Sequence, residues 1–447
     1  MRELDELLDR ALETLSSRRL AGEVYVEDLS VFSVSVSGGA IESLESQESR
    51  GAGVRVFEGE RVGFAYTSDL TPTGLAEAAG LARGLASKAD PDVDNALPEA
   101  DESPTPEPEV HDPAVARIDV QEKIRAARRI EEAARAADPR VKAARRSRYT
   151  DVVGRTGVAG TGGMRRAWPF TRIYGSIEVN AEEKGEQQSG WASDFAIRAG
   201  GLDPAAIGRE AARRALAKLG ARRAPTRRTN LVLDPVVASS LVEALSPSLH
   251  ADNTLKGKSL LASKLGASIG SPKVTLLDDG RAAGGDHSAP YDGEGVATRC
   301  TMLIEGGVLK GFLHSSYTSL RMAAAPTGNA ARASFKSPPR IAPSNLFLQP
   351  TGASRESLLA EAGDGLYITE VMGLHTIDPV SGDFSLGACG LALSGGQPGA
   401  PVDRIAVAGN VLGLLRSIGG VAVDLRFMPG GGAGSTTLLL DISVSGS

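Results

Sequence analysis

The first part of the chain alternates between helical and extended patterns of apolar residues. Residues 3–17 carry Leu and Ala at helical spacing, which predicts an amphipathic helix. Short alternating or β-branched runs then predict strands at 24–26, 32–36, 52–57 and 61–66. An alanine-rich stretch at 72–87 predicts a second helix. We therefore expect residues 1–87 to form one α+β unit in the order helix, strands, helix.

The same order returns after a break in the pattern. Helical spacing reappears at 119–137 and 204–219, and the runs between them predict strands at 172–179 and 190–198. This return suggests that residues 114–220 are a second α+β unit, produced by duplication of the first. The break, residues 88–113, holds six prolines and nine carboxylates. It is too poor in apolar residues to bury a core, so it is predicted to be an extended acidic surface linker.

The last part of the chain, residues 229–447, is rich in strand patterns and glycine turns. A basic segment, 221–228, leads into it as a hinge. Only 234–245 and 354–361 have a helical pattern, and strands are predicted at 273–277, 301–304, 308–313, 346–348, 365–369, 385–393 and 435–444. We expect a β-rich, barrel-like domain. The fold class of the whole chain is therefore α+β.

The helix predicted at 234–245 has clear ends. Asp234 suits the N-cap and Pro235 suits the first helical position. Pro247 marks the end of the helix, because proline removes a backbone donor and clashes with the preceding turn. Apolar side chains fall on one face at fourfold spacing, at Val237, Leu241 and Leu245.

Motifs along the chain resemble one family, the TldD/PmbA proteins, also called modulators of DNA gyrase. The resemblance runs through G-x-G-x-R-V at 51–56, L-I-E-G-G at 303–307, P-T-G-N at 326–329 and S-G-D-F at 381–384. No single tetrapeptide is specific, but their order and spacing span some three hundred residues. In the TldD branch, the helix at this place carries H-E-x-x-x-H, whose histidines bind a metal ion while the glutamate handles the water.

The matching hexad here keeps Glu243 but has Val242 and Pro247 at the histidine positions. Valine and proline offer no lone pair to a metal. The cysteine ligand that TldD proteins supply near the C-terminus is also missing, since no cysteine follows Cys389. This pattern resembles the PmbA branch, also called TldE. The resemblance implies that this chain holds no metal or other cofactor and that zinc belongs to a TldD-like partner.

The resemblance also implies a function and a set of site residues. It implies a non-catalytic subunit of a heterodimeric zinc metalloprotease, which degrades unfolded peptides or processes leader peptides of modified peptides. The degenerate positions Val242, Glu243 and Pro247 would then carry no catalysis. The candidates for lining the substrate channel are Glu243, His250, Ser381, Gly382, Asp383 and Phe384.

Composition limits the partners and the cellular location that we expect for this chain. The net charge of −6 argues against nucleic acid as a general partner. We expect no membrane association, since no apolar run reaches the roughly 18 residues of a span. The acidic, amphipathic N-terminus differs from a signal peptide. Two cysteines give no disulfide framework, so a reducing cytoplasm is the expected location.

Two other functions are compatible with the sequence. One is a hydrolase or peptidase that acts alone through an unrecognised site. Asp286, His287 and Ser288 have the residue types of a catalytic triad, but neighbours in sequence rarely form one. The other is a scaffold or peptide-binding protein that forms homodimers. The glycine run at 430–434 is expected to make a close turn rather than a nucleotide site.

Overall fold

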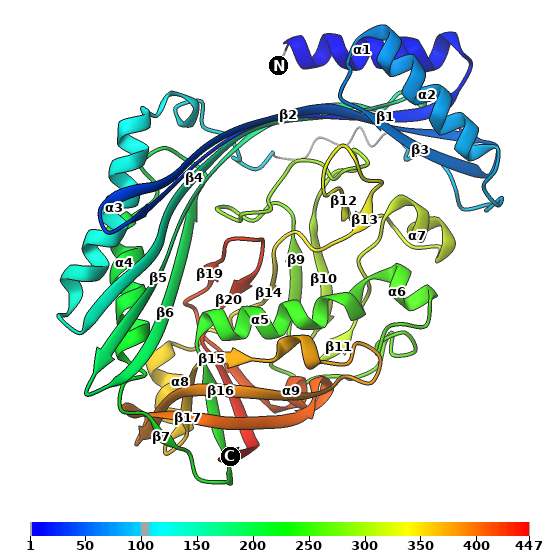
Figure 1. Ribbon diagram of the computed structural model, residues 1–447. Helices are drawn as coiled ribbons and strands as arrows, with labels where there is room; N and C mark the ends of the chain where they lie inside the picture. The colour runs from blue at the N-terminus through cyan, green and yellow to red at the C-terminus, as the bar shows by residue number, and fades with distance from the viewer. Residues whose placement is uncertain (1, 100–106, 447) are drawn as a thin grey trace.

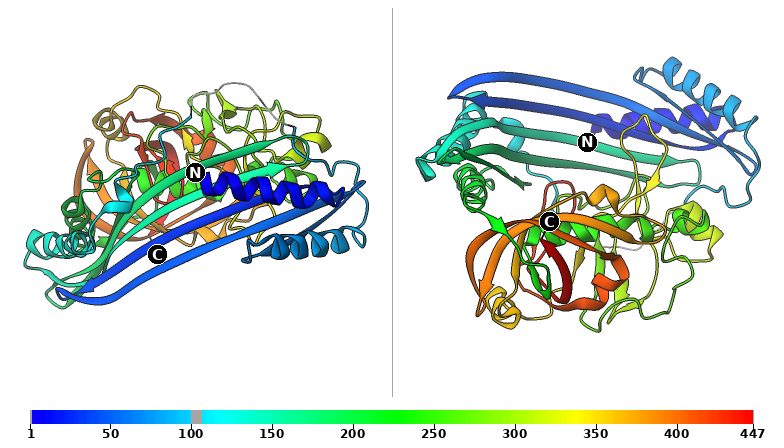
Figure 2. Two further views of the ribbon diagram at one scale, coloured as in Figure 1. Left: turned by 90° about the horizontal axis from the view of Figure 1, so that it is seen from above. Right: turned by 60° about the horizontal axis from the view of Figure 1, so that its bottom comes forward.

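A computed structural model describes residues 2–99 and 107–446. A long, curved sheet forms one layer, helices cover its convex side, and the C-terminal domain lies against its concave side (Figures 1 and 2). Within the described ranges, no helix combines the length and the apolar content needed to span a membrane.

The first α+β unit contains two helices and three strands. Its elements are α1 (Arg2–Ser17), β1 (Ala21–Ser37), β2 (Ala40–Glu58), β3 (Arg61–Thr67) and α2 (Pro72–Ala86). The predicted order is confirmed, but the two short strands predicted near the start are one strand, β1. The first half of β2 was not predicted. Its side chains are mostly exposed, and its backbone is held by pairing with β1 rather than by an apolar face.

The second unit repeats this arrangement. It contains α3 (Val120–Ala137), β4 (Val141–Gly160), β5 (Arg165–Glu183), β6 (Glu186–Ala196) and α4 (Pro204–Leu216), preceded by the 3-10 turn η1 (Val115–Arg117). The strand β4 has no counterpart among the predicted strands. The first half of β4 is rich in Arg and Lys, which hides the alternation of apolar and polar residues that predicts a strand. In the sheet, β4 lies between β1 and β5.

All six strands join in one antiparallel sheet with the order β3-β2-β1-β4-β5-β6. The two units meet where β1 pairs with β4, from Glu23 opposite Gly160 to Val36 opposite Ser147. Apolar residues of α1 and α2 pack on β1 and β2, and those of α3 and α4 pack on β4 to β6. The two halves are therefore one continuous structure.

The acidic segment predicted as a linker, residues 88–113, contains no helix or strand in its described parts, 88–99 and 107–113. Its other residues, 100–106, lie outside the described residues. Both described parts are tied to folded domains. Asp92 accepts a hydrogen bond from Tyr317 Oη at 2.7 Å. Val110 is buried, and its carbonyl accepts hydrogen bonds from Thr171 N and Arg172 Nη1.

The C-terminal domain contains a closed β-barrel, as predicted. Its strands are β8 (Arg227–Leu233), β15 (Leu366–Met372), β16 (Asp383–Ser394), β17 (Gln397–Asn410) and β21 (Thr437–Gly446), and β21 pairs with both β8 and β17. The helix α5 (Pro235–Leu245) packs its apolar face into the core of this domain. The strands β7 (Arg222–Arg223) and β18 (Ile418–Val421) extend the sheet.

A second sheet lies beside the barrel, in the order β11-β10-β9-β14. Its strands are β9 (Leu276–Asp279), β10 (Cys300–Glu305), β11 (Val308–Leu309) and β14 (Leu346–Leu348). The shorter elements are α6 (Ala251–Leu255), α7 (Ser316–Arg321), β12 (Ala330–Ala331), β13 (Arg340–Ile341), α8 (Arg355–Ala362), η3 (Leu374–Thr376), α9 (Val411–Ser417), β19 (Arg426–Phe427) and β20 (Ala433–Gly434). The helices α6, α7 and α9 were not predicted, because two turns or fewer carry too little periodicity.

Glycines of the first unit let the C-terminal domain approach the concave face of the sheet. A Cβ at Gly51 would collide with the ring of Phe335, and one at Gly53 would collide with the Phe335 carbonyl. Both glycines belong to the G-x-G-x-R-V motif. The motif therefore forms a flat docking surface for the loop that carries Phe335.

Two buried charge networks fix the sheet to the C-terminal domain. In the first, Arg55 Nη2 contacts Glu23 Oε2 at 3.0 Å and Glu294 Oε1 at 2.9 Å, and Arg332 pairs with Glu23. In the second, Arg172 Nε donates to the carbonyl and carboxylate of Asp286, at 2.7 and 3.0 Å. Each network contains a residue from the sheet and one from the C-terminal domain, so the relative position of the two is specified.

Candidate functional site

The helix α5 is anchored at its first turn by its N-cap, as predicted. Asp234 Oδ1 accepts a hydrogen bond from Val236 N at 3.1 Å. The same carboxylate accepts from Tyr367 Oη of β15 at 2.8 Å and from Arg214 Nη2 of α4 at 3.2 Å. The start of α5 is therefore held by both the barrel and the second α+β unit.

Val242 points into the apolar core of the C-terminal domain. Its exposed fraction is 7%, and it lines a cavity of about 50 Å³ together with other apolar side chains, among them Leu233, Leu276, Leu348 and Leu415. Pro247 is exposed and lies in the 3-10 turn η2 (Ser246–Leu249), beyond the end of α5. Because one position faces the core and the other the surface, the two positions do not converge on a common point.

These residues do not fit the metal that H-E-x-x-x-H would hold. Val242 and Pro247 have no side-chain donor, and the surroundings of Val242 are hydrocarbon. Within residues 2–99 and 107–446, no group of three or more His, Cys, Asp and Glu side chains is arranged to bind a metal ion.

Glu243 projects from a different side of α5 and borders a cavity of about 170 Å³. Its Oε1 accepts a hydrogen bond from Ser239 Oγ at 3.0 Å. Other walls come from the sheet, α4 and the β19–β20 loop: Trp191, Ser193, Arg214, Arg426 and Met428. A Cβ at Gly432 would collide with the Glu243 carboxylate, so this glycine lets the loop approach α5 closely. The expected turn lies just before it, where Gly430 and Gly431 have positive φ.

The loop over Glu243 is held by Asp286. Asp286 Oδ2 accepts a hydrogen bond from Gly430 N at 2.7 Å, and Oδ1 accepts from Tyr174 Oη at 3.0 Å. With its contacts to Arg172, this carboxylate joins the sheet, the loop and the C-terminal domain. The role of Asp286 was missed from the sequence, because its partners lie more than a hundred positions away.

His250 borders a different, larger cavity, of about 890 Å³, between the first unit and the C-terminal domain. Its Nε2 lies 3.0 Å from Ser246 Oγ, and burial lowers the pKa of the imidazole. Glu243 is not among the residues that line this cavity. The structure therefore places two of the channel candidates, Glu243 and His250, at different cavities.

Ser381, Gly382, Asp383 and Phe384 lie at the start of β16, in a turn held by its own hydrogen bonds. Asn410 Nδ2 donates to the carbonyl of Ser381 and to Asp383 Oδ1, both at 2.8 Å. Phe384 is buried in the core. The strand β16 pairs with β17 from Asp383 to Ser394 and with β15 from Gly387 to Ala392, so a peptide cannot add to the part that lies between these two neighbours.

Asp286, His287 and Ser288 do not form a catalytic triad. The Asp286 carboxylate contacts Arg172, Tyr174 and Gly430. The Ser288 hydroxyl donates to the carbonyl of Ala282 at 2.7 Å. The hydroxyl proton of Ser288 is therefore used in a hydrogen bond to the backbone.

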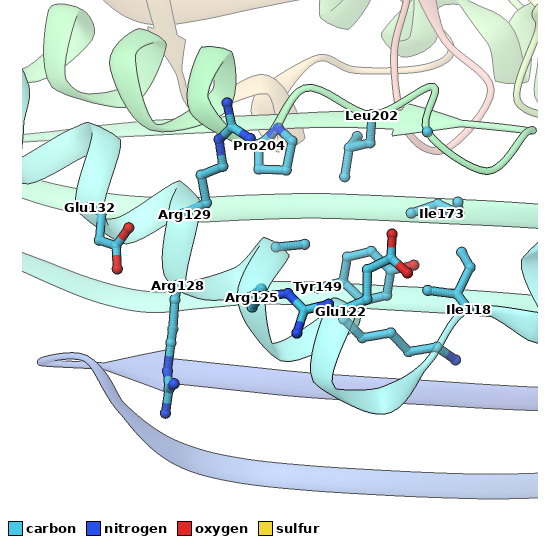
Figure 3. A pocket seen from close by; sticks show the side chains of 13 residues that line it. Ile118, Glu122, Arg125, Arg128, Arg129, Glu132, Tyr149, Ile173, Leu202 and Pro204 are labelled. Carbon is cyan, nitrogen blue, oxygen red and sulfur yellow. The ribbon is translucent and has the colours of Figure 1, made fainter.

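A further cavity, of about 710 Å³, lies on the helix side of the second unit, between α3 and the loop before α4 (Figure 3). Arg125, Arg128 and Arg129 of α3 project beside it, and Tyr149 and Ile173 of the sheet form its floor. It shares no lining residue with the cavity at Glu243.

Three models of one family match successive parts of the chain. They are the PmbA/TldA metallopeptidase domain 1 over residues 22–86, the central domain over 113–219 and the C-terminal domain over 226–446. The chain is 28% identical to the metalloprotease PmbA of Escherichia coli O157:H7, over 99% of this chain and 96% of that protein. It is 32% identical to a metalloprotease of Methanocaldococcus jannaschii, over 63% of each.

Solved structures have the same fold. One from Thermotoga maritima, named for modulation of DNA gyrase, aligns with a TM-score of 0.90 and 26% identity, over 99% of this chain and 100% of that one. TldE from Thermococcus kodakarensis aligns with a TM-score of 0.87, over 99% of this chain and 100% of that one. The two sequences are 20% identical, so this likeness shows a shared fold and no more. The family models together match most of the chain, and the chain is a member of the TldD/PmbA metallopeptidase family.

Proposed function

We propose that this chain is the TldE/PmbA-like, non-catalytic subunit of a heterodimeric zinc metalloprotease. A TldD-like partner would hold the zinc. The complex would degrade unfolded peptides or process the leader peptides of modified peptides. The observation that carries the proposal is the orientation of α5, which places an apolar residue in the core where the catalytic branch has a histidine.

The surroundings of Glu243 support a role in peptide binding. The strand β6 pairs only with β5 among the described strands, so its other edge is free. At Ser193 the carbonyl accepts a hydrogen bond from Arg426 at 3.3 Å, so a peptide that pairs there would take the place of that side chain. An extended peptide can add to such an edge through main-chain hydrogen bonds, which tolerate many sequences.

Trp191 gives this edge an apolar contact. Its exposed fraction is 54%, and it lines the cavity that Glu243 borders. Burial of so large a side chain favours binding, and tryptophan is common among residues that dominate binding energy. We therefore place the peptide along β6 rather than along β16.

The test is cleavage of an unstructured peptide by this chain, by a TldD-like subunit and by their mixture. We expect no cleavage by this chain alone and strong cleavage by the mixture. Within the mixture, Trp191→Ser should raise KM for the peptide while the zinc content stays unchanged. Leu265→Ser is the matched control, because Leu265 is 60% exposed and does not line this cavity.

Two results would overturn the proposal. One is cleavage by this chain alone that survives chelation of metals. The other is a stable complex with a TldD-like subunit whose activity equals that of the subunit by itself.

A further inference from the structure

The helix α2 carries an apolar face that no other part of the described chain covers. Its inner face packs on the first unit through Leu75, Ala78, Ala79, Ala82 and Ala86. On the outer face, Leu81 is 64% exposed and Leu85 is 53% exposed. The helix lies at the periphery of the molecule, on the outer side of the sheet next to the edge strand β3 (Figures 1 and 2).

Gly80 and Gly84, each one position before a leucine, lie on the same exposed side of the helix. A Cβ at Gly80 or Gly84 would meet no atom within 4 Å, so neither glycine is needed for packing within the chain. Glycine is among the least favourable residues in a helix. Two of them on an exposed face leave hollows in which another helix could place large side chains.

The exposed face that contains these leucines and glycines has a charged residue at each end. Glu77, Leu81, Gly84 and Lys88 follow each other at spacings of four, three and four, which keeps them on one side of the helix. Lys88 lies just past the last helical residue, where Ser87 N still bonds to Arg83 O at 2.9 Å. Neither Glu77 nor Lys88 has an ion pair within the described part of the chain.

We propose that this face binds the same face of a second copy of the chain, with the two α2 helices antiparallel. Centred between Leu81 and Gly84, such a pairing places Leu81 over Gly84 of the second copy and Leu85 over Gly80. The same register places Glu77 beside Lys88 of the second copy, and Lys88 beside its Glu77. The face is thus complementary to itself in both shape and charge, which is the condition for a twofold interface.

The contact is small, because it involves one helix of four turns from each copy. Interfaces that bury less than about 1,200 Å² in total are typical of weak association. We therefore expect a dimer that forms with increasing protein concentration. The proposal goes beyond the protease assembly, since the contact would join two chains of this kind whether or not each has a TldD-like partner.

Charge exchange tests the register directly. The full-length chain and its variants are compared by sedimentation velocity over a wide range of concentration. Glu77→Lys alone and Lys88→Glu alone should each weaken self-association roughly tenfold, because two attractive pairs become repulsive. A mixture of the two variants, or one chain carrying both changes, should restore it, because opposite charges then meet again.

Filling a hollow tests the close approach of the helices. Gly84→Gln should abolish association, whereas Arg83→Gln is the control on the adjacent exposed position. Thermal unfolding of each variant checks that the fold is retained. A chain that stays monomeric at high concentration would overturn the proposal, and so would a dimer unaffected by these changes. Loss of binding to a TldD-like subunit would assign the face to that partner instead.

Discussion

Restoring both histidines of H-E-x-x-x-H should destabilise this protein without giving it a metal site. Val242→His places an imidazole among hydrocarbon side chains, where its ring nitrogens have no partner. Each unsatisfied polar group costs about 1–3 kcal/mol, and overpacking adds about 1–3 kcal/mol. The cavity of about 50 Å³ beside Val242 is lined almost entirely by hydrocarbon, so it offers the imidazole space without hydrogen-bond partners. We expect the double variant with Pro247→His to lose about 2–6 kcal/mol of unfolding free energy.

The loss should depend on pH. A buried imidazole has a pKa below the roughly 6.5 of the unfolded chain, because burial disfavours its charged form. Between the two pKa values the unfolded state binds more protons, so the stability of the variant falls as pH decreases below about 6.5.

Denaturant unfolding at about pH 8 and pH 5.5, with and without zinc, measures both effects. Val242→Leu controls for volume, and Pro247→His alone controls for a change at an exposed position. Stoichiometric zinc that raises the unfolding midpoint of the double variant would refute the reasoning. Peptide turnover by that variant alone would do so more strongly.

Two further predictions concern buried charges. Arg172→Met should lower the free energy of unfolding by about 3–5 kcal/mol, because it leaves the buried Asp286 carboxylate without its cation. Arg198→Met, which breaks an exposed ion pair, should lower it by less than about 1 kcal/mol. Equal losses in chemical denaturation would contradict this prediction. Burial raises the pKa of Asp278 to about 7, above the ordinary 3.8, so its contribution to stability is complete at acid pH and is lost as pH rises through about 7. Asp278→Asn should therefore flatten the decline in stability between about pH 4 and 7, and an unchanged pH profile would show that another group is responsible.

The sequence predicted elements wherever a local signal was present. Asp234 and Pro235 marked the start of α5, and the structure confirms the cap. The polar half of β2 and the basic half of β4 carried no such signal. The polar half of β2 is ordered by its pairing with β1, and the basic half of β4 mainly by its pairing with β5. Pairing between distant segments of this kind has no trace in local periodicity.

The sequence identified the residues of the candidate site but did not predict how they are arranged in space. The loss of histidines at Val242 and Pro247 is visible in the sequence. The separation of Glu243 from His250 is not, because it depends on the turn η2 that redirects the chain after α5. The free edge of β6 beside Glu243 also required the fold, since only the sheet order identifies an outermost strand.

The pairing of β1 with β4 has a consequence for synthesis. One side of β1 can pair with β2 as soon as the hairpin leaves the ribosome, but the other side must wait for β4. Glu23 finds its partner only after Gly160 has been translated and released from the exit tunnel. During that interval β1 is an open edge on a nascent chain, where chaperones or neighbouring chains can pair with it. The N-terminal unit can therefore complete its sheet only when the second unit has emerged.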